Sequence, residues 1–156
     1  MLVETRSQLE NLFSKVKPYF PEINPRLRIN KKKRKNYVMV ADVSYSGDIL
    51  YNPDIYGGYS VEEVRGIFAH EFGHLINQAA MKYLSSKEKE RRRIDYELNQ
   101  DYRREIERAA DRTAVLRGFG KEIYHLIFIS LLDENWRKKR GVEHLSLVEI
   151  IRLMKK

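Results

Sequence analysis

The chain has 156 residues, a length that fits one domain with a hydrophobic core of its own. It contains 30 Lys and Arg residues against 22 Asp and Glu residues, so its formal net charge is +8 and its surface must be densely charged. Cysteine is absent, which excludes both a disulfide framework and a thiolate zinc site. Any metal site must therefore use histidines and carboxylates.

Neither end of the chain nor its interior carries a membrane signal. The first ten residues include several charges and lack the apolar core of a signal peptide. The longest apolar run, residues 126–132, is far shorter than the roughly 20 residues that span a membrane. These features predict a cytoplasmic protein without a membrane span.

The first third of the chain predicts one helix and three short strands. Residues 3–17 carry apolar side chains at helical spacing and are followed by a proline-rich connector. Residues 26–29, 37–41 and 49–51 are typical of strands. The five bases at residues 31–35 suit the exposed tip of a hairpin between the first two strands.

A long apolar helix is predicted next. Ser60 followed three residues later by Glu63 is a capping box, which marks the first turn of a helix. The apolar residues that follow cover a broad face, so this helix is expected to cross the core. They are Val61, Val64, Ile67, Phe68, Phe72, Leu75 and Ile76.

The second half of the chain also predicts helices. Residues 85–104 are strongly charged and indicate a solvated helix or a mobile loop, whereas residues 105–118 have the small side chains of a packed helix. Residues 121–140 predict an amphipathic helix, and a last helix begins at Ser146 with a capping box to Glu149. Together the elements predict an α+β fold in which a small three-stranded sheet packs on two central helices.

Within the long helix, His70-Glu71-Phe72-Gly73-His74 is the pattern most typical of a function. Residues four apart lie one turn apart on the same helix face, so His70 and His74 can offer two nitrogens to one metal ion. Glu71 then lies beside the metal, where its carboxylate can take a proton from a metal-bound water and pass it to a leaving amine. This pattern is typical of zinc hydrolases.

A catalytic zinc ion needs a third protein ligand. The extended metalloprotease pattern with a third histidine is absent, because Asn77 and Ala80 stand at the positions of its glycine and histidine. Glu107 is the candidate, since Ala110 and Ala114 on the same face would let its helix approach closely. Three other acidic residues remain alternatives, namely Glu97, Asp101 and Glu105.

Asp111 lies one turn after Glu107 on the same helix face. From there its carboxylate can accept the free imidazole N–H of His70, which would fix the tautomer of that ring and raise its basicity. One segment would then supply both a metal ligand and the group that supports another ligand.

The two motifs, at residues 70–74 and 107–120, resemble those of the gluzincin zinc peptidases. The likeness is greatest to the minigluzincins, soluble relatives of the catalytic core of membrane-embedded prenyl-protein endopeptidases and heat-shock membrane proteases. The resemblance implies a zincin-like domain over residues 1–156. It also implies that His70, His74 and Glu107 bind Zn²⁺, that Glu71 is the general base and that Asp111 supports His70.

The same resemblance raises two further expectations. Minigluzincins are described as latent enzymes whose C-terminal segment blocks the cleft, so residues 121–156 would confer latency. A peptide substrate would add as a strand to an exposed sheet edge. The residues that match the family's edge strand are Ile49, Leu50 and Tyr51.

The sequence predicts a zinc metallopeptidase but leaves two matters open. It does not choose a transition-state donor among Tyr124, His125 and His144, because none has a diagnostic spacing. The alternative function is a basic nucleic-acid-associated module with a structural or vestigial zinc site. It is suggested by the net charge of +8, the basic run at residues 31–35 and the arginines at residues 91–93, which could neutralise phosphates.

Overall fold

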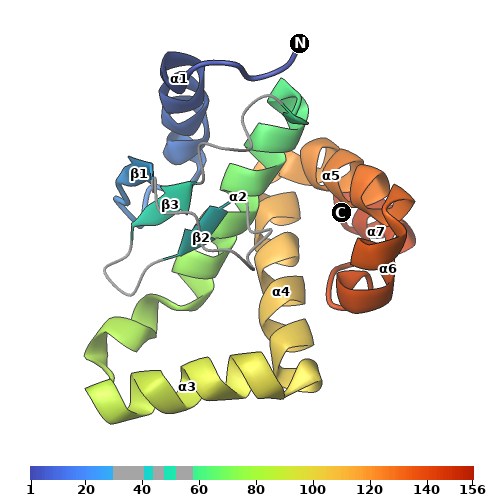
Figure 1. Cartoon of the computed structure of the whole chain (residues 1–156). Helices are drawn as coiled ribbons and strands as arrows, with labels where there is room; N and C mark the ends of the chain where they lie inside the picture. The colour runs from blue at the N-terminus through green and yellow to red at the C-terminus, as the bar shows by residue number, and fades with distance from the viewer. Residues whose placement is uncertain (30–40, 44–47, 52–57) are drawn as a thin grey trace.

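The computed structural model describes residues 1–29, 41–43, 48–51 and 58–156. Within them, one long helix, α2 (Val61–Asn77), runs through the middle of the molecule (Figure 1). It begins at the predicted capping box: Ser60 Oγ accepts the Glu63 N–H at 3.2 Å, and Glu63 Oε2 accepts the Ser60 N–H at 2.7 Å. Since its middle turns are buried all round, α2 is the element on which the others pack.

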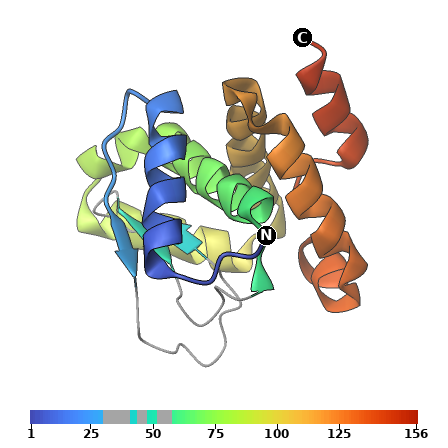
Figure 2. The ribbon, with the colours of Figure 1, turned by 90° about the horizontal axis from the view of Figure 1, so that it is seen from above.

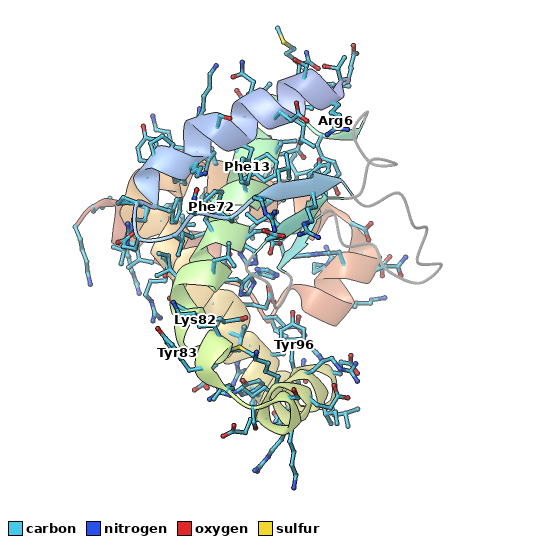
Figure 3. The ribbon with its side chains drawn as sticks, turned by 90° about the vertical axis from the view of Figure 1, so that its left-hand side faces the viewer. Arg6, Phe13, Phe72, Lys82, Tyr83 and Tyr96 are labelled. Atoms are coloured by element: carbon cyan, nitrogen blue, oxygen red, sulfur yellow. The ribbon has the colours of Figure 1, made fainter. Side chains whose placement is uncertain are left out.

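The N-terminal helix predicted from apolar spacing is α1 (Arg6–Val16), and it covers one side of α2. Aromatic rings form the contact: the centroid of Phe13 lies 5.5 Å from that of Phe68 and 5.3 Å from that of Phe72. Figure 3 shows Phe13 and Phe72 meeting between the two helices. A short turn of helix, η1 (Lys17–Tyr19), ends α1.

The predicted α+β class is wrong, because the described part of the chain is mostly helical, with 75% helix and only 5% strand. The three described strands, β1 (Leu27–Ile29), β2 (Ala41–Val43) and β3 (Ile49–Tyr51), are three residues long each. They pair in the order β1-β3-β2 and are too short to form a layer of the core. The core is made by helices, and the strands lie beside it.

The predicted pairing of the strands is also wrong. β3 is the central strand, parallel to β1 and antiparallel to β2, so β1 and β2 are not a hairpin and β3 is not an exposed edge. The physical reason is that β3 lies against the core: Ile49 and Tyr51 project from one face and are both fully buried. A strand so placed needs partners for its backbone groups along both edges, which β1 and β2 supply. The predicted edge strand Ile49-Leu50-Tyr51 is therefore corrected, and the predicted hairpin tip at residues 31–35 lies outside the described residues.

Two helices follow α2 after a short helical turn, η3 (Ala79–Tyr83). Helix α3 (Ser86–Leu98) lies across the ends of α2 and α4, and α4 (Gln100–Ala114) runs back beside α2 (Figure 1). The described side chains of α3 are all exposed or half-buried, as its charged sequence predicts. The packed helix predicted from residue 105 is the second half of α4.

The C-terminal helices complete the core on the side of α2 away from α1 (Figure 2). A wide helical turn, η4 (Val115–Phe119), leads into α5 (Gly120–Leu132), and Gly118 takes φ +96° there, a conformation that favours glycine. The helix predicted over residues 121–140 is broken at Asp133, whose side chain accepts the Trp136 N–H at 3.0 Å and begins α6 (Glu134–Arg140). Helix α7 (Leu147–Met154) begins at the predicted Ser146 capping box.

Candidate metal centre

Helices α2 and α4 approach each other closely at Gly73. A Cβ atom built on Gly73 would lie 2.5 Å from the carbonyl oxygen of Ala110, a distance that side chains do not tolerate. Ala110 and Ala114 are fully buried at the same contact. The small residues therefore bring the backbone of α4 against the helix that carries His70 and His74, as the sequence predicted.

This approach places Glu107 against both histidines. Its Oε2 lies 3.1 Å from His70 Nε2, and its Oε1 lies 3.5 Å from His74 Nε2. The two Nε2 atoms are themselves 3.0 Å apart. All three side chains are buried, with residue exposures of 8% for each histidine and 4% for the glutamate.

The spacing of these four atoms, two imidazole nitrogens and two carboxylate oxygens, fits a metal ion. Ligand atoms about 2.1 Å from a tetrahedral zinc ion lie about 3.4 Å from one another, close to the observed 3.0, 3.1 and 3.5 Å. Two imidazole nitrogens that face each other cannot each donate a hydrogen bond to the other, whereas a cation between them accepts both lone pairs. The donor set and its spacing thus both fit a cation.

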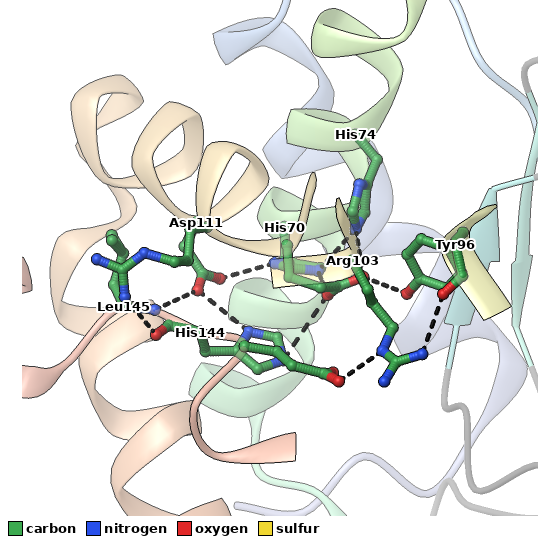
Figure 4. A network of polar contacts seen from close by, with 10 residues as sticks. His70, His74, Tyr96, Arg103, Asp111, His144 and Leu145 are labelled. Carbon is green, nitrogen blue, oxygen red and sulfur yellow. Dashed lines mark hydrogen bonds and ion pairs between the residues drawn. The ribbon is translucent and has the colours of Figure 1, made fainter. Parts of the chain in front are cut away.

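Asp111 supports two histidines at once (Figure 4). Its Oδ1 lies 2.8 Å from His70 Nδ1, and its Oδ2 lies 3.1 Å from His144 Nδ1. Oδ2 also accepts the backbone N–H of Leu145 at 3.0 Å. The carboxylate therefore orients the His70 ring, as predicted, and also ties down the segment that carries His144.

The surrounding carboxylates stabilise positive charge at His70. Burial alone would lower the pKa of His70, but its hydrogen bonds to Asp111 and Glu107 outweigh burial and raise the pKa well above 6.5. Burial alone would raise the pKa of Glu107, but the adjacent His74 and His70 outweigh it and lower that pKa well below 4.5. Two buried carboxylates thus create a negative pocket that favours a cation.

His144 comes to the centre from the segment between α6 and α7. Its Nε2 lies 3.7 Å from Glu107 Oε2, while its backbone carbonyl accepts a hydrogen bond from Arg108 Nη1 at 3.0 Å. Its ring stacks on that of Trp136 with centroids 5.3 Å apart. Of the three candidate donors, the structure brings this one to the metal ligands.

The other predicted candidates lie elsewhere. The ring of Tyr124 stacks on Phe128 along α5, and His125 on the same helix belongs to neither of the metal-ligand clusters found among the described residues. The alternative ligands Glu97 and Asp101 form exposed ion pairs with arginines on their own helices, and Glu105 is exposed. Glu107 is therefore the carboxylate that joins the histidines.

Sequence reasoning did not find Tyr96. This residue lies near the end of α3, and its hydroxyl donates a hydrogen bond to Glu107 Oε1. Arg103 lies close by and bonds to Glu143, the buried residue just before His144. Both lie within the charged stretch of residues 85–104, where a single tyrosine or arginine carries no distinguishing pattern.

Two overlapping groups of side chains are each close enough together to bind a metal ion. The first is buried His70, His74 and Glu107, and the second is His70 and Asp111 with half-buried His144. Glu71 is buried on α2 between the two histidines. No protein-family model, curated protein or solved structure matches the chain. Among the described residues, no helix is both long enough and apolar enough to cross a membrane.

Proposed function

We propose that the protein is a zinc-dependent peptidase of the gluzincin type. The observation that carries the proposal is the buried triad of His70, His74 and Glu107, with Glu71 on the same helix turn. Two imidazoles and one carboxylate are a ligand set of catalytic zinc, which keeps a fourth position for water or substrate. Zinc held there would act as a Lewis acid on the scissile carbonyl and would acidify the attacking water.

The residues around the triad have separate tasks in this proposal. Glu71 takes the proton from the attacking water and passes it to the departing amine. Asp111 fixes the orientation of His70 through the contact at Nδ1. His144 faces the ligands through Nε2 and stabilises the developing oxyanion by donating a hydrogen bond.

An extended peptide can be held by the edge of the small sheet. β2 pairs with β3 on one side and lies against α2, the helix of the metal ligands. It is an edge of the described sheet, so the backbone groups on its outer side could bind a peptide as a further strand. This assigns to β2 the role that the sequence predicted for residues 49–51.

Replacing Glu71 tests the mechanism directly. Glu71→Gln removes the base but keeps the size of the side chain, so we expect it to retain zinc and to lose at least 100-fold of the rate of peptide hydrolysis. Zinc content is measured by elemental analysis, and hydrolysis is measured with a quenched fluorescent peptide library.

Two companion variants make the result interpretable. Glu62→Gln changes an exposed glutamate on the same helix and should keep the wild-type rate. His74→Ala should lose zinc binding and activity together, because it removes one of three ligands. A full wild-type rate in zinc-loaded Glu71→Gln would refute the assigned mechanism.

A further inference from the structure

Helix α3 is held to the rest of the molecule by few contacts. None of its described side chains is buried, and its apolar residues Ile94 and Leu98 are 41% and 81% exposed. A helix of this length and charge is only marginally stable when isolated in water. Its attachment must therefore come from specific contacts near its C-terminal end.

Tyr96 makes the contact that reaches furthest into the molecule. The half-buried side chain extends from α3 towards the metal ligands, and its hydroxyl donates to Glu107 Oε1 (Figure 4). Glu107 Oε1 lies 3.5 Å from His74 Nε2, and Glu107 Oε2 lies 3.1 Å from His70 Nε2. The tyrosine therefore holds the oxygen that faces His74, and the other oxygen faces His70.

Arg103 on α4 fixes the position of Tyr96. Its Nη1 donates to the backbone carbonyl of Tyr96 at 3.0 Å and to that of Glu97 at 3.1 Å. Its guanidinium also lies 6.0 Å from the centroid of the Tyr96 ring. The same side chain bonds to Glu143, so one arginine connects the end of α3 with the segment that carries His144.

We propose that Tyr96 is a positioning residue for the metal-binding carboxylate, and that docking of α3 and metal binding stabilise each other. A ligating carboxylate depends on hydrogen bonds that orient it, and losing such a bond costs about 10- to 100-fold in metal affinity. Coupling between two equilibria is reciprocal, so bound metal must favour the docked helix by the same factor. The inference rests on the metal centre of the proposed function and does not require that the protein hydrolyse peptides.

The first test measures zinc affinity by competition with a chromophoric chelator. Tyr96→Phe keeps the ring and removes the hydroxyl, so we expect its Kd for zinc to rise by at least about 10-fold. Tyr83→Phe is the matched control, since that residue is 81% exposed and precedes α3. A wild-type Kd in folded Tyr96→Phe would overturn the proposal.

The second test needs no variant. Amide hydrogen exchange of the wild-type chain is compared in zinc and in excess chelator, with no peptide substrate present. We expect zinc to slow the exchange of α3 by up to the factor found for affinity, in addition to protecting α2 and α4. Protection of α2 and α4 with unchanged exchange in α3 would overturn the coupling, while peptide cleavage is decided separately by the Glu71 experiment.

Discussion

Asp111 shows how much one residue can organise. Its two oxygens contact different partners. Oδ1 contacts Nδ1 of His70, and Oδ2 contacts Nδ1 of His144 and accepts the backbone N–H of Leu145. Burial alone would raise the pKa of Asp111, but His144 and His70 outweigh it and lower the pKa, so the group stays ionised. A buried carboxylate with these contacts fixes both histidines relative to each other.

The contacts of His70 with Asp111 and Glu107 make the stability of the metal-free protein depend on pH. The pKa of His70 is raised on folding, so its contribution to stability is complete below about pH 6.5, the value of an unperturbed histidine, and is lost as the pH rises through the raised pKa. We therefore expect the melting temperature in excess chelator to be lower at pH 9 than at pH 6. Thermal unfolding followed by circular dichroism measures this difference.

The variant His70→Gln identifies the group responsible. It cannot titrate, so its melting temperature in chelator should change less between pH 6 and pH 9 than that of the wild type. An equal change in both proteins would assign the pH dependence to other groups. Adding zinc should raise the melting temperature of the wild type more at pH 9 than at pH 6, because a bound imidazole nitrogen must be deprotonated.

At the scale of elements, the contact between α2 and α4 decides whether the centre forms. Gly73→Ala places a methyl group 2.5 Å from the Ala110 carbonyl oxygen, so the helices must separate. Alanine gains about 1 kcal/mol of helix propensity over glycine, but overpacking against backbone costs about 1–3 kcal/mol or more. We expect a net loss of stability in urea unfolding and a weaker affinity for zinc.

Gly58→Ala is the control for Gly73→Ala. A Cβ atom on Gly58 would have no neighbour within 4 Å among the residues that the structure describes, so Gly58→Ala should leave zinc affinity unchanged. If Gly73→Ala bound zinc as tightly as the wild type, the close approach of the two helices would not be what positions Glu107.

Local patterns predicted the helices better than the sheet. The capping boxes at Ser60 and Ser146 fixed where α2 and α7 begin, because they depend only on neighbouring residues. The order of β1, β2 and β3 depends on contacts between distant segments. Strands of three residues are also too short to show the alternation of apolar and polar residues from which pairing could be predicted. The α+β class was therefore wrong although three strands were anticipated.

The residues of the candidate site also divide into those that local spacing predicts and those that only the folded chain brings together. His70, His74, Glu107 and Asp111 could be named because helical spacing relates each pair, and the small residues near Glu107 indicated a close helix contact. His144 was one of three unranked candidates, since only the folded chain brings the segment after α6 to α4. Tyr96 could not be named at all, because nothing in a charged helix distinguishes the residue that faces inward.

At the scale of the whole molecule, residues 141–156 belong to the core as well as to the site. Leu145 and Ile150 are 2% and 0% exposed, and losing a buried side chain of this size costs about 2–5 kcal/mol. The free energy of unfolding of a native domain is only about 5–15 kcal/mol. We expect deletion of residues 141–156 to abolish cooperative thermal unfolding and peptide hydrolysis.

This deletion also tests the predicted latency. Removal of Lys155 and Lys156 alone is the control, because both are exposed and follow α7. A shortened chain that stayed folded and cleaved peptides faster would identify residues 141–156 as a block over the site. The nucleic-acid alternative also stays a prediction. Of the basic residues that suggest it, those at 31–35 lie outside the described part of the chain, and the arginines at 91–93 are exposed on α3.

The contact between His70 and Glu107 joins positions 37 residues apart, whereas the two histidines are four residues apart. In an unfolded chain the histidine pair can form within one turn of helix, but bringing in the carboxylate requires closing a long loop, which has an entropic cost. A partly unfolded chain thus retains two ligands and loses the third. Release of the ion would therefore report the separation of α4 from α2 and would serve as an early signal of unfolding.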